Sequence, residues 1–150
     1  MNEKQFSIAG AVIYWKLAGR SDRRTLEDGF NAIGYKSACP APICNRSALR
    51  DALTEHKGRL GKTVLVRQLA DVNAFALVDE RRGVDANEYE QLATVRVDES
   101  GRLEFSGVDL AFEDNVREAF KTALTTVGQG ELSRALVGLV DTLHGISLRP

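Results

Sequence analysis

The chain has 150 residues, of which 43% are hydrophobic and 27% are charged. This length and apolar content fit one globular domain with a core and exclude a disordered chain. The longest apolar run, Ile8 to Tyr14, is far shorter than the roughly 20 residues that a membrane-spanning helix needs. The formal net charge of −1 neither favours nor excludes nucleic acid as a partner.

Charge is distributed unevenly along the sequence. Residues 1–67 carry twelve basic and six acidic side chains, a net charge of +6, whereas residues 68–150 carry eight basic and fifteen acidic ones, a net charge of −7. Such asymmetry indicates a basic binding surface, an acidic surface for a partner, or head-to-tail association of like subunits. The alternative is that the two halves neutralise each other within one fold.

The first third of the chain predicts a strand, a short helix and a loop. Alternation from Ala11 to Leu17 is typical of a strand that is buried on both faces. Thr25 is expected to cap a helix that ends at Gly34. One face of this helix carries Leu26, Phe30 and Ile33. Residues 35–45 hold both cysteines and two of the three prolines, which predicts a constrained loop.

A second helix and a strand meander follow. Asn45 or Ser47 is expected to open the helix and Gly58 to close it. Its apolar stripe consists of Leu49, Ala52, Leu53 and His56. Four segments then alternate with a period near two: Thr63 to Leu69, Ala74 to Glu80, Glu88 to Asp98 and Arg102 to Ser106. The short polar connections between them predict antiparallel neighbours.

Helical periodicity returns in the last third of the chain. One helix is expected from Asp109 to just before Gly128, and a second helix, with an apolar stripe from Leu132 to Leu143, is expected to end at Gly145. The final residues, 146–150, resemble the start of another strand, so either the chain is the N-terminal part of a longer protein or this is a frayed terminus. Together the elements predict a single α+β domain, residues 1–150, with an antiparallel sheet of about five strands. Two short helices lie in its N-terminal half. Two amphipathic C-terminal helices are expected to pack on the sheet or on each other.

A Gly-Lys-Thr sequence at residues 61–63 resembles the end of a phosphate-binding loop. That motif requires a glycine at position 56, which is His56 here, and it requires a strand before the loop and a helix after it. The predicted order is the reverse. The segment is therefore interpreted as a helix-to-strand turn.

The cysteines leave several alternatives open. Cys39 and Cys44, followed by His56, approximate three ligands of a zinc site, but no fourth ligand lies nearby and the other histidine is the distant His144. A disulfide between the cysteines and two unrelated loop thiols are the other interpretations. A cysteine–histidine nucleophile pair lacks an orienting third group. Two cysteines are too few for a secreted disulfide scaffold, so we expect a cytoplasmic protein, and no cofactor or metal site is assigned.

Acidic side chains gather on the predicted strands or at their ends. They are Asp79, Glu80, Glu88, Glu90, Asp98 and Glu99. Paired carboxylates could support glycosidase or metal chemistry. Charged side chains also protect strand edges from aggregation, and this is the favoured interpretation.

The basic cluster is the main candidate binding site. Its members are Arg46, Arg50, Lys57, Arg59, Lys62 and Arg67. Arg46 and Arg50 are four residues apart on a predicted helix, so they point the same way and can bind neighbouring carboxylates or phosphates. Binding to nucleic acid usually adds exposed aromatic side chains, and only Tyr35 lies nearby.

Segments near both ends of the chain resemble an uncharacterised family of bacterial and bacteriophage proteins. They are Ile13 to Gly19, Thr25 to Asp28 and Leu143 to Pro150. The resemblance implies an origin in a phage or mobile element and a chain that continues beyond Pro150. It carries no functional site to this sequence.

These observations favour a non-enzymatic protein-interaction or assembly module, which pairs a basic N-terminal surface with an acidic surface of a partner or of a second copy. The alternative is a nucleic-acid-binding accessory protein that uses the basic cluster. An enzyme of unrecognised type is the third class considered.

Overall fold

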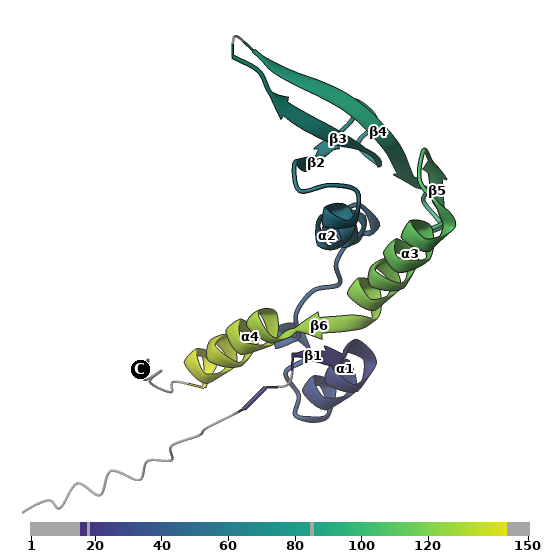
Figure 1. Ribbon diagram of the computed structural model, residues 1–150. Helices are drawn as coiled ribbons and strands as arrows, with labels where there is room; N and C mark the ends of the chain where they lie inside the picture. Colours follow the sequence, from purple (N-terminus) through teal and green to yellow (C-terminus); the bar gives the residue numbers. More distant parts are fainter. Residues whose placement is uncertain (1–15, 18, 85, 144–150) are drawn as a thin grey trace, which may run out of the picture.

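The computed structural model describes residues 16–17, 19–84 and 86–143. It confirms the α+β class (Figure 1). In chain order the elements are β1 (Arg20–Asp22), α1 (Arg23–Ala32), the 3-10 turn η1 (Lys36–Ala38), α2 (Asn45–His56), the 3-10 turn η2 (Lys57–Arg59), β2 (Val64–Gln68), β3 (Ala74–Arg82), β4 (Asn87–Val97), β5 (Leu103–Ser106), α3 (Leu110–Thr125), β6 (Thr126–Gly128) and α4 (Gln129–Thr142). None of these helices is long and apolar enough to span a membrane.

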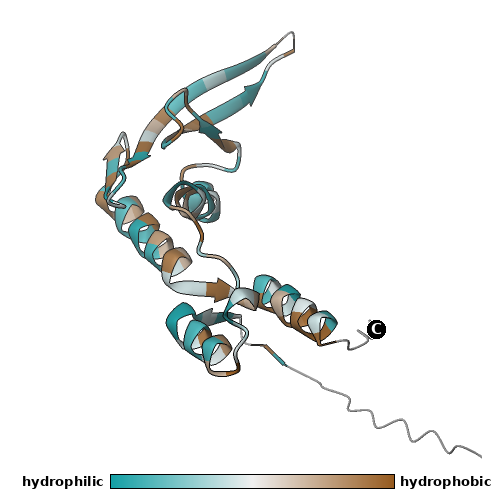
Figure 2. Cartoon of the chain, turned by 180° about the vertical axis from the view of Figure 1, so that it is seen from behind, coloured by the Kyte–Doolittle hydropathy of each residue, from teal (hydrophilic) through white to brown (hydrophobic). Residues whose placement is uncertain are grey.

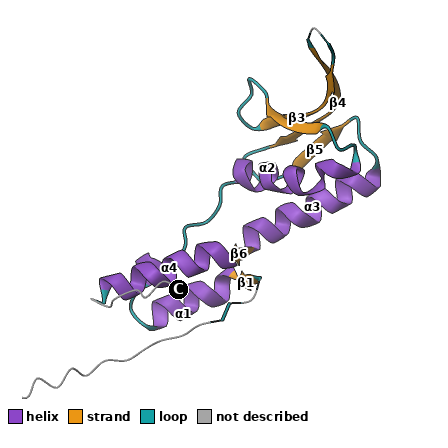
Figure 3. Cartoon of the chain, turned by 60° about the vertical axis from the view of Figure 1, so that its left-hand side comes forward, coloured by secondary structure: helices purple, strands orange, loops and turns teal. Residues whose placement is uncertain are grey.

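Four strands form the antiparallel meander that the sequence predicts, in the order β2-β3-β4-β5. Helices α2 and α3 contribute to the same hydrophobic cluster as one face of this sheet. The cluster is built from apolar side chains at alternate strand positions, including Leu77 and Val95, and from helix positions including Leu53 and Val116, all of which are fully buried. The result is a two-layer arrangement with both helices on one face (Figure 3).

The hairpin of β3 and β4 extends beyond its neighbours. Strand β2 pairs with β3 only as far as Asp79, and β5 pairs with β4 only from Thr94 onward. The hairpin therefore continues as a two-stranded ribbon that projects from the sheet (Figure 1). We call residues 79–90 the arm; most of its described residues are hydrophilic (Figure 2).

A second hydrophobic cluster lies beside the two-stranded sheet of β1 and β6. Its buried members are Phe30 of α1, Val127 of β6 and Leu132 of α4. The antiparallel pairing of Arg20 with Gly128 brings distant parts of the sequence together. Arg23, only 9% exposed, donates through Nη1 to the Pro40 carbonyl oxygen at 2.9 Å and ties α1 to the segment that leads into α2.

Several local expectations need correction. The cap of α1 is Asp22 and not Thr25, because the Asp22 carboxylate accepts the Thr25 backbone N–H at 2.8 Å. The helix that begins after Asp109 ends at Thr125 and does not extend to Gly128. Val127, which was expected within it, lies in β6, because a run of β-branched residues favours extended backbone.

The packing of the last helix also differs from expectation. Helix α4 packs on the second cluster, with partly buried Ala135, Leu136 and Leu139 against it, and not on the four-stranded sheet. Leu143 is 55% exposed. Residues 11–15 of the predicted first strand, the predicted helix end at Gly145 and the predicted final strand lie outside the described residues. Lys16 and Leu17 have no regular structure.

Candidate interaction surface

Helix α2 carries the candidate site, and its buried face fixes its orientation. Ala48, Leu49, Ala52 and Leu53 are each at most 2% exposed and pack in the main cluster. This spacing is that of one helical stripe, and the exposed positions of the helix are Arg46, Arg50, Asp51, Thr54 and Glu55. The helix begins at Asn45, one of the two predicted starting residues, and Cys44 is its N-cap.

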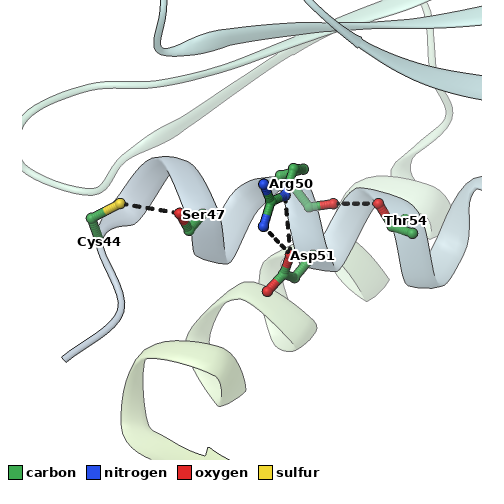
Figure 4. A network of polar contacts seen from close by, with 5 residues as sticks. All are labelled: Cys44, Ser47, Arg50, Asp51 and Thr54. Carbon is green, nitrogen blue, oxygen red and sulfur yellow. Dashed lines mark hydrogen bonds and ion pairs between the residues drawn. The ribbon is translucent and has the colours of Figure 1, made fainter. Parts of the chain in front are cut away.

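Three of the six predicted basic residues follow one line along α2 and into η2. Arg50 and Lys57 follow Arg46 by four and eleven residues, which at 3.6 residues per turn places all three within about 40° around the helix axis. Arg46 and Arg50 are exposed and Lys57, the first residue of η2, is half-buried. The Arg50 guanidinium lies 3.2 Å from the Asp51 carboxylate (Figure 4). Both side chains are more than half exposed, so this pair has little energetic value.

The other three basic residues divide between two places. Arg59 and Lys62 are exposed on η2 and on the loop that leads into β2. Arg67 alternates in β2 with Val64 and Val66, which belong to or pack on the main cluster. It therefore lies on the sheet face that points away from α2 and α3. We call Arg46, Arg50, Lys57, Arg59 and Lys62 the basic surface.

The glycine-rich segment at residues 58–63 connects a helical region to a strand. It joins α2 and η2 to β2, in the order that the sequence predicts. No helix begins after the lysine of the Gly-Lys-Thr sequence, so the backbone amides that hold phosphate in a phosphate-binding loop are not presented here.

The two cysteines lie in different environments and both are free thiols. The Cys44 Sγ atom lies 3.3 Å from Ser47 Oγ, and hydrogen bonding to the side chain and backbone of Ser47 lowers the pKa of the exposed Cys44 thiol (Figure 4). Cys39 packs beside the second cluster, where burial raises the pKa of its thiol and the nearby Glu27 raises it further.

The proposed zinc ligands do not converge. Cys44 and His56 stand at opposite ends of α2, and twelve residues at 1.5 Å per residue separate their backbones by about 18 Å. The same separation rules out Cys44 and His56 as a nucleophile pair. In the described part of the chain no three Cys, His, Asp or Glu side chains are placed to hold a metal ion.

Two shallow hollows adjoin α2. One, of about 220 Å³, lies between the end of α2, α3 and β1 and is lined by Arg20, Glu55, His56, Asn115 and Glu118 among others. The other, of about 370 Å³, surrounds the start of α2 and includes Cys44, Arg46, Asp98 and Glu99. Both mix positive and negative side chains. Their residues come from elements distant in sequence, so no local pattern could have indicated them.

Comparison with known proteins gives one match. Residues 8–150 match the model of DUF6744, a family of unknown function. The chain belongs to that family. The DUF6744 match covers both hydrophobic clusters and the basic surface. No curated protein matches the chain. No solved structure matches it either.

The candidate acidic residues of this DUF6744 chain lie on the neighbouring strands β3 and β4, except Asp98 and Glu99, which follow the end of β4. Asp79 is opposite Glu90 in the β3–β4 register, and Arg81 is opposite Glu88. Arg81 contacts two carboxylates, that of Glu90 at 2.6 Å and that of Asp79 at 3.4 Å. The arm as a whole carries five acidic and two basic side chains, a net charge of −3. Negative charge is therefore concentrated on the part of the hairpin that projects from the sheet.

Proposed function

We propose that this chain is a protein-interaction module that binds an acidic protein partner through its basic surface. The observation that carries the proposal is that Arg46 and Arg50 are exposed, one turn apart, on a helix whose apolar stripe is fixed in the core, with Lys57 half-buried just beyond the helix end. Within the described ranges, Arg46 and Lys57 have no carboxylate within 4.0 Å. Their charge is available to a partner.

Carboxylates suit this surface because of its geometry. Two arginines one helical turn apart can each form a bidentate pair with a carboxylate of a partner segment. Charge complementarity of this kind mainly speeds association and selects among partners. A phage or mobile-element origin and a cytoplasmic location, both expected from the sequence, belong to the same proposal.

Binding to a chemically defined acidic probe tests this function. Fluorescence anisotropy would measure the affinity for labelled poly-glutamate and for a labelled DNA duplex at low and at moderate salt. The test variant is Arg46→Glu/Arg50→Glu. The matched control is Arg24→Glu/Arg134→Glu, which reverses two exposed charges on α1 and α4.

We expect poly-glutamate to bind to the wild-type chain and to the control, and the test variant to lose about tenfold or more in affinity. A wild-type chain that does not bind poly-glutamate overturns the proposal. Binding to the duplex alone, with a steep loss as salt rises, would replace it with the nucleic-acid alternative.

A further inference from the structure

The arm has unbalanced negative charge that its own chain does not compensate. Arg81 is shared between Asp79 and Glu90, and in the described residues no cation lies within ion-pair distance of Glu88. The Glu80 carboxylate accepts hydrogen bonds from the Asn87 amide at 3.1 Å and from the Tyr89 hydroxyl at 3.0 Å, which orient it without neutralising it.

The base of the arm adjoins one end of the basic surface, because the hydroxyl of Thr63, next to Lys62, donates to the Asp79 carboxylate. The arm leaves the sheet at the end where β2 begins and points away from α2 in both views of the backbone (Figures 1 and 3). Beyond Asp79 the arm therefore leads away from α2, which carries Arg46 and Arg50. Opposite charges that the backbone holds apart in one molecule can meet between two molecules.

Symmetric pairing of two arms is disfavoured. The outer edge of β4 is unpaired from Asn87 to Gln91, and an antiparallel pair of two such edges centred on Tyr89 would place Glu88 of one copy opposite Glu90 of the other. Like charges directly opposite each other destabilise a strand pair. The surface that complements the arm is therefore basic and not another arm.

We propose that the arm of one copy binds the basic surface of a second copy, head to tail. This inference rests on the proposed function and names its partner. The contact is heterologous, since each copy contributes a different surface, so it leaves one free arm and one free basic surface on every dimer. Such contacts continue into an open chain or close into a ring.

Mixing two complementary variants tests the inference. The first variant, Arg46→Glu/Arg50→Glu, keeps the arm and reverses the basic surface. The second, Glu88→Lys/Glu90→Lys, keeps the basic surface and reverses the arm. Light scattering coupled to size exclusion, at about 100 µM protein and low salt, would give the mass of each sample. Circular dichroism would check the fold, and Glu88→Gln/Glu90→Gln would replace the second variant if it does not fold.

We expect the wild-type chain to form multimers that dissociate at high salt and each variant alone to be monomeric. An equal mixture should assemble again, because the arm of the first variant and the basic surface of the second have opposite charge, as do the two reversed surfaces. Arg24→Glu/Arg134→Glu should assemble as the wild type does. Variants that assemble like the wild type, or a mixture that stays monomeric, overturn the inference. If poly-glutamate binds while the wild-type chain stays monomeric, this inference fails and the proposed function stands.

Discussion

Truncation of Leu53 tests whether α2 is held against the sheet as described. Leu53 of α2 is fully buried in the cluster that α2 shares with α3 and the strands, so Leu53→Ala removes apolar contacts and leaves a cavity. Leu-to-Ala changes at such sites cost 2–5 kcal/mol, and we expect the free energy of unfolding to fall by about 3 kcal/mol. For a chain of this length the midpoint temperature should fall by about 10 °C.

Urea denaturation followed by circular dichroism would measure this loss. Leu110→Ala is the control, because Leu110 is 76% exposed and its truncation should change stability by no more than about 0.5 kcal/mol. A loss below about 1 kcal/mol for Leu53→Ala would refute the packing of α2. Leu132→Ala, in the second cluster, should shift the same single transition if the chain is one domain, whereas two transitions would refute that expectation.

Three further predictions concern thiols, acid stability and glycines. Iodoacetamide should modify Cys44 faster than Cys39 near neutral pH, because the pKa of the exposed Cys44 thiol is lowered and that of Cys39 is raised. Peptide mass spectrometry would measure the two rates of modification, and equal rates would contradict the prediction. Hydrogen bonds from the Ser100 side chain, then the Arg102 backbone, hold the pKa of Asp98 below its usual value. The stability it contributes is therefore present above the unfolded pKa and lost as pH falls through the folded pKa, so the midpoint difference between wild type and Asp98→Asn should shrink from pH 7 to about pH 2. Gly107→Ala should lower stability by more than about 1 kcal/mol, because Gly107 has φ +86° and an added Cβ would lie 2.4 Å from a β4 carbonyl oxygen. Gly138→Ala on α4 meets open space and should stabilise the protein by about 0.5–1 kcal/mol. Equal thermal midpoints for the two variants would contradict this reasoning.

The main sheet could be predicted because the sequence pattern that specifies its strands lies within each strand and its short connections. A period of two over 63–106, with short polar connections, specifies neighbouring antiparallel strands, and the register confirms them. The pairing of β1 with β6 could not be predicted. Each strand has only three residues, and the pair depends on contacts between distant parts of the sequence. Propensity has little weight over so short a segment.

The basic cluster could be predicted only in part. The four-residue spacing of Arg46 and Arg50 correctly placed them on one helix face. Sequence proximity did not show that Arg67 lies on the opposite sheet face, although its alternation with Val64 and Val66 carried that signal. The projection of the arm depends on where β2 and β5 stop pairing, which a hydrophobic pattern does not specify.

The pairing of β1 with β6 also has a consequence for the order of folding. It makes the four-stranded sheet with α2 and α3 an insertion between the two halves of the second cluster, since α1 precedes that unit and α4 follows it. Strand pairs in the inserted unit join consecutive elements, whereas β1 must close a loop of about 100 residues to reach β6, at a larger entropic cost. The inserted unit should therefore form early, and the second cluster should be the last part to assemble and the first to open.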